Sequence, residues 1–161
     1  MILLAFAILL VLVCSYAFAR GGQPERLMAG LFVLGLLSTV LISAWTPPRP
    51  REFQLGIFIV DATMLFAMVP IMLKANRLWP IAVMAMQLLA VIGHLIKLLD
   101  PNVVTVLYWI VNVFWSIPQT LLLGLGVHRH VHRERRFGVE RSWSNTSDRS
   151  RAAEPERPPT N

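Results

Sequence analysis

The chain has 161 residues, of which 55% are hydrophobic and only 15% are charged, and its formal net charge is +6. A soluble domain carries about 25% charged residues, so this composition excludes an ordinary soluble globular protein. The positive charge is unevenly placed, because eight of the fifteen Lys and Arg residues follow Val127. A basic segment beside apolar blocks is typical of a membrane surface, and we expect no nucleic-acid partner because no folded module presents the charge.

Five hydrophobic blocks, each about 18 to 25 residues long, fill most of the chain, and a helix of that length crosses a ~30 Å hydrocarbon core. We therefore predict an all-α, polytopic integral membrane protein. Short links make consecutive helices antiparallel neighbours, so the expected fold is a compact up-and-down bundle. The predicted spans, which together form one transmembrane domain (residues 1–127), are residues 2–19, 27–45, 53–73, 79–99 and 103–127.

The first block has two interpretations. Its end, Ala17-Phe18-Ala19, resembles a signal-peptide cleavage site, but the block lacks a positively charged start and is longer than the usual apolar region of a signal peptide. If the block is retained, nine basic residues lie in the inside segments and three lie outside; cleavage would reverse this bias. We therefore predict five retained spans with the N-terminus outside and the C-terminus in the cytoplasm.

The second block carries small residues at four-residue spacing, namely Gly35, Thr39 and Ser43. Such a stripe lets two helices approach closely, either within one bundle or between a bundle and a partner. We expect a close helix contact along this face.

Polar residues inside the third, fourth and fifth blocks need a specific explanation, because an ionisable group within a span costs about 2.5–3.5 kcal/mol on insertion scales. Counting residues along each span puts Asp61, His94 and Asn112 in one layer, roughly 4–8 Å from the centre toward the outer face. Gln87, His94 and Lys97 form one stripe on the fourth block, and we expect this stripe to face the bundle interior. On the fifth block, Ser116 and then Gln119 or Thr120 continue the stripe that contains Asn112.

We predict that the side chains of Asp61 and His94 interact directly or through one water. Two roles follow from this arrangement. The layer either serves only as hydrogen-bonded contacts between helices, or forms a small proton-responsive or substrate-binding site, since an Asp–His pair can share a proton near neutral pH.

Lys97 and Asp100 lie a turn apart at the outer end of the fourth block. The pattern favours a lysine that extends its amine to the interface and forms an ion pair there. Alternatively, these two residues form the outer mouth of a site that leads to His94.

The segment after Val127 is basic, and residues 128–161 are expected to form a cytoplasmic juxtamembrane segment followed by a disordered tail rich in Ser, Arg, Glu and Pro. If the last helix continues into this segment, His128 and His132 share a face, but two imidazoles without further ligands are a poor metal site. The residues expected to contact anionic lipid are Arg129, Arg133, Arg135 and Arg136.

No catalytic signature appears: the chain has no H-E-x-x-H, no G-x-S-x-G and no paired carboxylate within a span. We therefore predict no enzyme, no cofactor and no metal. The first functional hypothesis is an accessory or structural subunit of a membrane assembly, with the bilayer and a membrane-protein partner or a second copy as partners. The second is a small transporter or channel component that uses the Asp/His/Asn layer. Thirteen arginines against two lysines suggest a GC-rich bacterial genome, and hence a multi-pass protein of the bacterial inner membrane.

Overall fold

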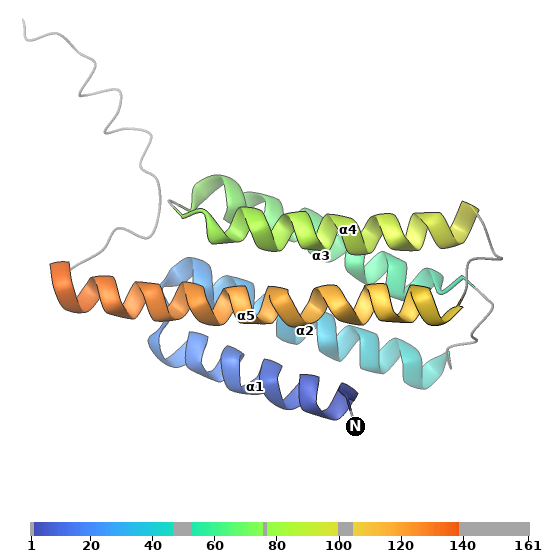
Figure 1. Cartoon of the computed structure of the whole chain (residues 1–161), viewed down its shortest axis with the longest axis horizontal. Helices are drawn as coiled ribbons and strands as arrows, with labels where there is room; N and C mark the ends of the chain where they lie inside the picture. Colours follow the sequence, from blue (N-terminus) through green and yellow to red (C-terminus); the bar gives the residue numbers. More distant parts are fainter. Residues whose placement is uncertain (1, 47–52, 76, 100–104, 139–161) are drawn as a thin grey trace, which may run out of the picture.

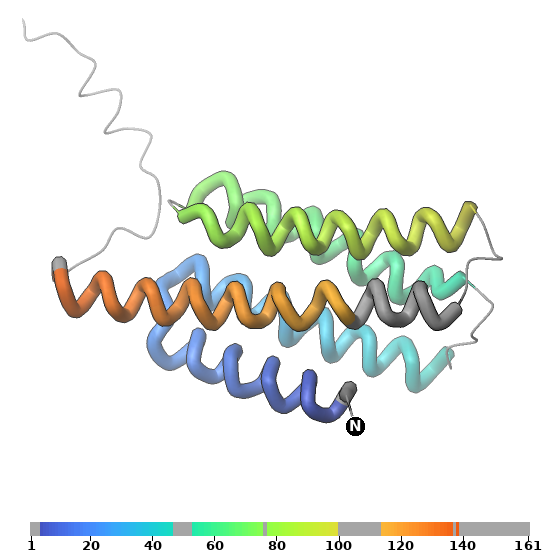
Figure 2. Tube along the Cα trace, viewed as in Figure 1, coloured from blue at the N-terminus to red at the C-terminus, as the bar shows by residue number. Residues whose placement is uncertain are grey.

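The computed structural model describes residues 2–46, 53–75, 77–99 and 105–138, and their side chains except at 2, 3, 105–113 and 137; Figure 2 shows the other positions in grey. Within these ranges the chain forms five helices and no strand, which confirms the all-α prediction for this part of the chain. The helices are α1 (Ile2–Arg20), α2 (Gln23–Trp45), α3 (Leu55–Lys74), α4 (Trp79–Leu99) and α5 (Thr105–Phe137).

The helices run side by side in alternating directions (Figure 1). Each helix contacts the next one along the chain, α1 contacts α5, and α2 also touches α5. The α1–α2 link, the α3–α4 link and the C-terminal end of α5 therefore all lie at one end of the bundle (Figure 1).

Breaker residues fix where the helices turn. The amide of Gly21 donates to the carbonyl oxygen of Ala17 (2.8 Å), and a Cβ at Gly21 would lie 2.5 Å from that same oxygen, so only glycine fits. Pro24 sits in the first turn of α2, where a missing N–H costs no hydrogen bond. This tight link brings α1 and α2 together as antiparallel neighbours.

Three of the helices, α2, α3 and α4, are long and apolar enough to cross a membrane. Leu4–Arg20 within α1 is a shorter apolar helix, and the side chains of α5 are described only from Phe114 onward. Large apolar side chains point outward from the bundle, for example Phe66, 74% exposed. In water such a surface would be unfavourable, whereas lipid chains can cover it.

The last helix does not stop at the end of the predicted fifth span. It continues through the basic segment as far as Phe137, so α5 extends beyond the rest of the bundle (Figure 1). Gly138, with φ of +77°, ends it in a left-handed conformation that favours glycine. The tail expected to be disordered, residues 139–161, lies outside the described residues.

The bundle is packed solidly only at the end that holds the two links. There, side chains from every helix meet with little or no exposure, and we call this region the packed half. The core cluster consists of Leu10, Cys14, Ala17, Met28, Ala29, Phe32, Met68, Ile71, Val83, Leu123 and Val127, of which Leu10 and Phe32 also border the cavity of the other half. The opposite end, which contains Gln54 and Ala44, is the hollow half, because it surrounds a cavity.

Candidate functional site

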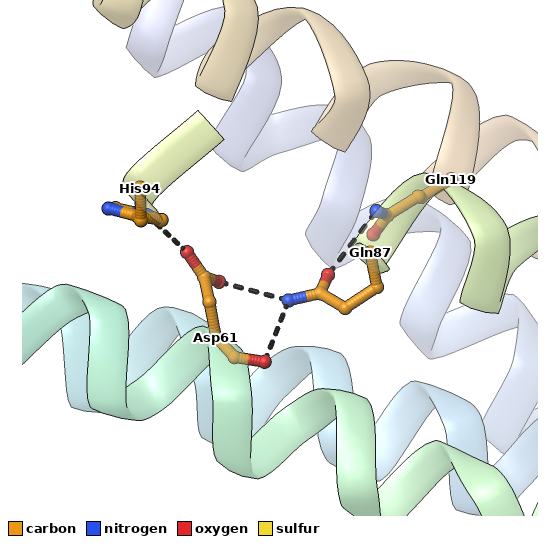
Figure 3. A network of polar contacts seen from close by, with 4 residues as sticks. All are labelled: Asp61, Gln87, His94 and Gln119. Carbon is orange, nitrogen blue, oxygen red and sulfur yellow. Dashed lines mark hydrogen bonds and ion pairs between the residues drawn. The ribbon is translucent and has the colours of Figure 1, made fainter. Parts of the chain in front are cut away.

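Four polar side chains from three helices form a connected network in the hollow half (Figure 3). His94 Nε2 on α4 lies 2.8 Å from Asp61 Oδ2 on α3. The side-chain amide of Gln87, also on α4, donates to Asp61 Oδ1 and to the Asp61 carbonyl oxygen, both at 3.1 Å. Gln119 on α5 donates to Gln87 Oε1 at 3.3 Å. The network therefore links three consecutive helices through one carboxylate.

Helix geometry explains why these residues meet. Gln87 and His94 are seven residues apart, which is two turns, so both project from the same face of α4 toward α3. The side chain of His94 is 1% exposed, whereas that of Asp61 is 23% exposed. Phe58 places its ring edgewise against the imidazole, with 6.1 Å between ring centroids. His94 is thus held on its ring face while the carboxylate remains partly open.

Asp61 opens onto a cavity of about 700 Å³ that is lined by residues from all five helices. Small-molecule sites are typically concave, mainly apolar, about 300–1,000 Å³ in volume and fitted with a few polar groups. This cavity has that character, because its lining is mainly apolar and includes the polar network together with a few hydroxyl groups. The apolar lining includes Phe6, Leu10, Phe32, Leu36, Ile57 and Met64.

The predicted layer is present in part. The structure places Asp61 and His94 in direct contact, as their matched depths predicted, and Gln87, which was predicted to belong to the same polar site, joins their network. On the α5 stripe, Gln119 joins the network, while the Thr120 hydroxyl donates to the Ser116 carbonyl oxygen on its own helix. The side chain of Asn112 lies outside the described residues. Whether the layer binds a ligand stays a prediction.

Lys97 is buried on the inward face of α4, as its place on the stripe with Gln87 and His94 predicted, and this burial contradicts the interfacial position that was also expected. The sequence favoured an amine that reaches the interface, but Lys97 is only 2% exposed and is buried one turn beyond His94. The reason is its register: position 97 falls on the same inward face of α4 as positions 87 and 94. Asp100, the other half of the proposed mouth, lies outside the described residues.

The small-residue stripe on α2 is used inside the bundle. Gly35 lies against the Met64 thioether of α3, so closely that any side chain at this position would displace it. One and two turns further along, Thr39 and Ser43 line the cavity. The stripe therefore provides both the close α2–α3 contact and two hydroxyl groups on the cavity wall.

A second polar cluster, at the end of the packed half, was not predicted. Arg77 of the α3–α4 link forms an ion pair with Glu25 of α2, and its guanidinium lies 2.9 Å from His130 Nδ1 of α5. Glu25 is fully buried, and Arg77 and His130 are each 7% exposed. The only available sequence signal was an acid and a base in two links on the same side of the membrane, which does not show that they meet.

The arrangement supplies hydrogen-bond donors and acceptors around one carboxylate. No three His, Cys, Asp or Glu side chains come together as a ligand set anywhere in the described part of the chain. Comparisons with protein-family models, with curated proteins and with solved structures found no match to this chain. The chemistry of the cavity and its polar network is then the basis for a functional proposal.

Proposed function

We propose that this chain is a non-enzymatic, five-span membrane protein whose cavity binds a small amphipathic molecule, as a component of a transporter. The observation that carries the proposal is the 700 Å³ cavity with the Asp61–His94–Gln87–Gln119 network in its lining. An apolar body would lie against the Phe and Leu side chains, and its polar group would reach the carboxylate.

A purely structural network is the competing explanation, and the cavity argues against it. Polar contacts that only join helices are usually enclosed, as the Glu25–Arg77 pair of the packed half is, whereas the Asp61 side chain is 23% exposed and lines the cavity. The packed half shows that the same five helices can fill their interior. A partly exposed carboxylate beside a large cavity is better explained by a ligand than by interhelical contacts alone.

The proposed orientation is N-out and C-in, in the bacterial inner membrane. The end of the bundle with the α1–α2 and α3–α4 links also holds the basic extension of α5, which matches the positive-inside rule if this end faces the cytoplasm. The cavity then lies in the outer half of the membrane. Reporter fusions at Gly138 and Thr46 test this orientation, and an external signal from Gly138 would contradict it.

Ligand binding is tested with the purified full-length chain and a panel of amphipathic cations, anions and neutral compounds. A ligand at 100 times its Kd stabilises the folded state by about 2.7 kcal/mol, which a thermal shift detects. Ala44 lines the cavity and Ala85 is exposed on α4 outside it. Ala44→Phe should therefore abolish the shift of any active compound, and the matched control Ala85→Phe should keep it.

Two results would contradict the proposal. One is a panel in which no compound of any charge class stabilises the wild-type protein. The other is an active compound whose shift survives in Ala44→Phe and in Asp61→Leu alike, because such a compound binds elsewhere.

The role of an accessory subunit stays a second proposal from sequence. The stripe of small residues that suited a partner helix faces α3 and the cavity in the structure, so it does not favour a partner. Mild-detergent purification from native membranes tests this role directly. A partner chain that co-purifies in fixed proportion would support it.

A further inference from the structure

A second, smaller cavity lies at the opposite end of the bundle from the first site. Its volume is about 360 Å³, and it forms where the end of α1, the α1–α2 link, the start of α2 and the extension of α5 converge. We call it the basic cavity. Its lining residues are Ala19, Arg20, Gly21, Arg26, His130, Val131, Glu134 and Arg135.

The charge of the basic cavity is strongly one-sided. Three arginines against one glutamate leave two net positive charges, with His130 counted as neutral. The arginines belong to three different elements: the end of α1, the first turns of α2 and the extension of α5. The folded bundle brings these arginines together, because they come from separate parts of the sequence and not from a single basic run.

Part of the basic cavity is rigid. Gly21 and His130 are buried and form its floor, while the three arginines are exposed at its rim. The Nε of Arg26 donates to the Gly21 carbonyl oxygen at 2.9 Å, which fixes one edge of that guanidinium. Arginine can only donate, so the 2.9 Å contact from Arg77 requires His130 Nδ1 to accept and places the ring N–H on Nε2.

We propose that the basic cavity binds a phosphate group, either in the headgroup of an anionic lipid or as free phosphate. Guanidinium groups bind phosphate oxygens with paired, charge-assisted hydrogen bonds, and several around one cavity match a tetrahedral anion. The cavity lies where the apolar helices end, which is headgroup depth if α2, α3 and α4 cross the membrane. The extension of α5 past Val127 supplies His130 and Arg135, and this gives the long last helix a function.

This proposal differs from general attraction between basic residues and anionic lipid. Arg129 and Arg136 are on the same helix and are exposed, but they do not line the basic cavity. Diffuse attraction would use them as much as it uses Arg20 and Arg26. A built site would depend on the lining arginines alone.

Native mass spectrometry of the full-length chain, with added phosphatidylglycerol or phosphatidylcholine, measures how much lipid binding depends on the lining arginines. Two charge-matched double variants are compared: R20Q/R26Q in the cavity and R129Q/R136Q outside it. Each lining arginine near the membrane surface contributes about 1 kcal/mol, so the first variant should bind phosphatidylglycerol about thirtyfold more weakly. The second variant should bind like wild type.

A variant that binds phosphatidylglycerol more tightly than wild type is a useful test, because misfolding cannot explain a gain of affinity. Glu134 is the acidic residue in the lining, so Glu134→Gln should bind phosphatidylglycerol about fivefold more tightly. Competition by inorganic phosphate separates the two sources: displacement at millimolar concentration identifies free phosphate, and no displacement identifies the lipid. Equal losses in both double variants would overturn the proposal, and so would a wild type that binds phosphatidylglycerol no better than phosphatidylcholine and also shows no binding of inorganic phosphate.

Discussion

At one end of the bundle, Glu25 and Arg77 form an ion pair beside a core in which Met28, Met68 and Leu123 have no exposed surface. At the other end, Asp61 and His94 form a second acid–base contact, but this carboxylate opens onto a cavity of about 700 Å³. The same five helices build both ends, so the difference lies in their side chains.

The two halves differ in what surrounds the polar group. In the packed half the ion pair is enclosed, and its role is to join α2, the α3–α4 link and α5. In the hollow half the network joins α3, α4 and α5 and still leaves part of the Asp61 carboxylate open. A structural role therefore suits the first pair, and a binding role suits the second.

The largest loss is expected from breaking the ion pair of the packed half. Glu25→Ala leaves the guanidinium of Arg77 buried without its carboxylate, and such a break costs about 3–5 kcal/mol. Denaturant unfolding in detergent, followed by tryptophan fluorescence, measures the loss. The charge-free double variant Glu25→Leu/Arg77→Met is the control and should recover much of the stability. If Glu25→Ala unfolds like wild type, the pair does not hold this end together.

Two methionines one turn apart on α3 test the contrast in packing. Met68 is fully buried in the packed half, so Met68→Ala should cost about 2–5 kcal/mol in the free energy of unfolding. Met64 packs against Gly35 but borders the cavity and is only partly buried, so Met64→Ala should cost less than Met68→Ala. Equal losses from the two substitutions would mean that the cavity is filled or collapsed in solution.

The hollow half was largely predictable from sequence. Apolar blocks of spanning length fix the depth of each residue, and helical spacing fixes its face, so Asp61, Gln87 and His94 could be placed together. For Lys97 the helical spacing was the better guide, because its register on the inward face of α4 predicts burial, whereas its position near the helix end suggested the interface. The cavity itself was not predictable, because spacing does not reveal whether facing side chains fill the space between helices.

The packed half was much harder to predict. Glu25 and Arg77 are 52 positions apart, in turn regions where charged residues are usually solvated. Their contact depends on how the start of α2 and the α3–α4 link converge, with α5 continuing as far as His130 beside them. No local sequence pattern predicts that convergence. The basic cavity could not be predicted from the sequence for the same reason.

Within the hollow half, two substitutions of Asp61 separate hydrogen bonding from charge. Asp61→Leu leaves the donors of Gln87 and His94 without their acceptor, which costs about 1–3 kcal/mol for a buried polar group. Asp61→Asn should cost less, because an amide can accept from Gln87 and donate to His94. If Asp61→Asn keeps the stability but loses the response to a ligand identified in the compound panel, the charge serves binding. If it loses neither, the network is structural.

The smallest effect is expected at the edge of the network. Gln119→Leu removes the long 3.3 Å hydrogen bond to Gln87, and polar contacts between membrane helices average about 0.6 kcal/mol. The adjacent Thr120→Val is the control, since its hydroxyl bonds only within α5. Double-mutant cycles then decide how far the network extends. The coupling energy between Gln119→Leu and Asp61→Asn is compared with that between Thr120→Val and Asp61→Asn. A larger value for the first pair would show that Gln119 on α5 is energetically coupled to the Asp61 carboxylate through Gln87. Equal couplings would confine the site to α3 and α4.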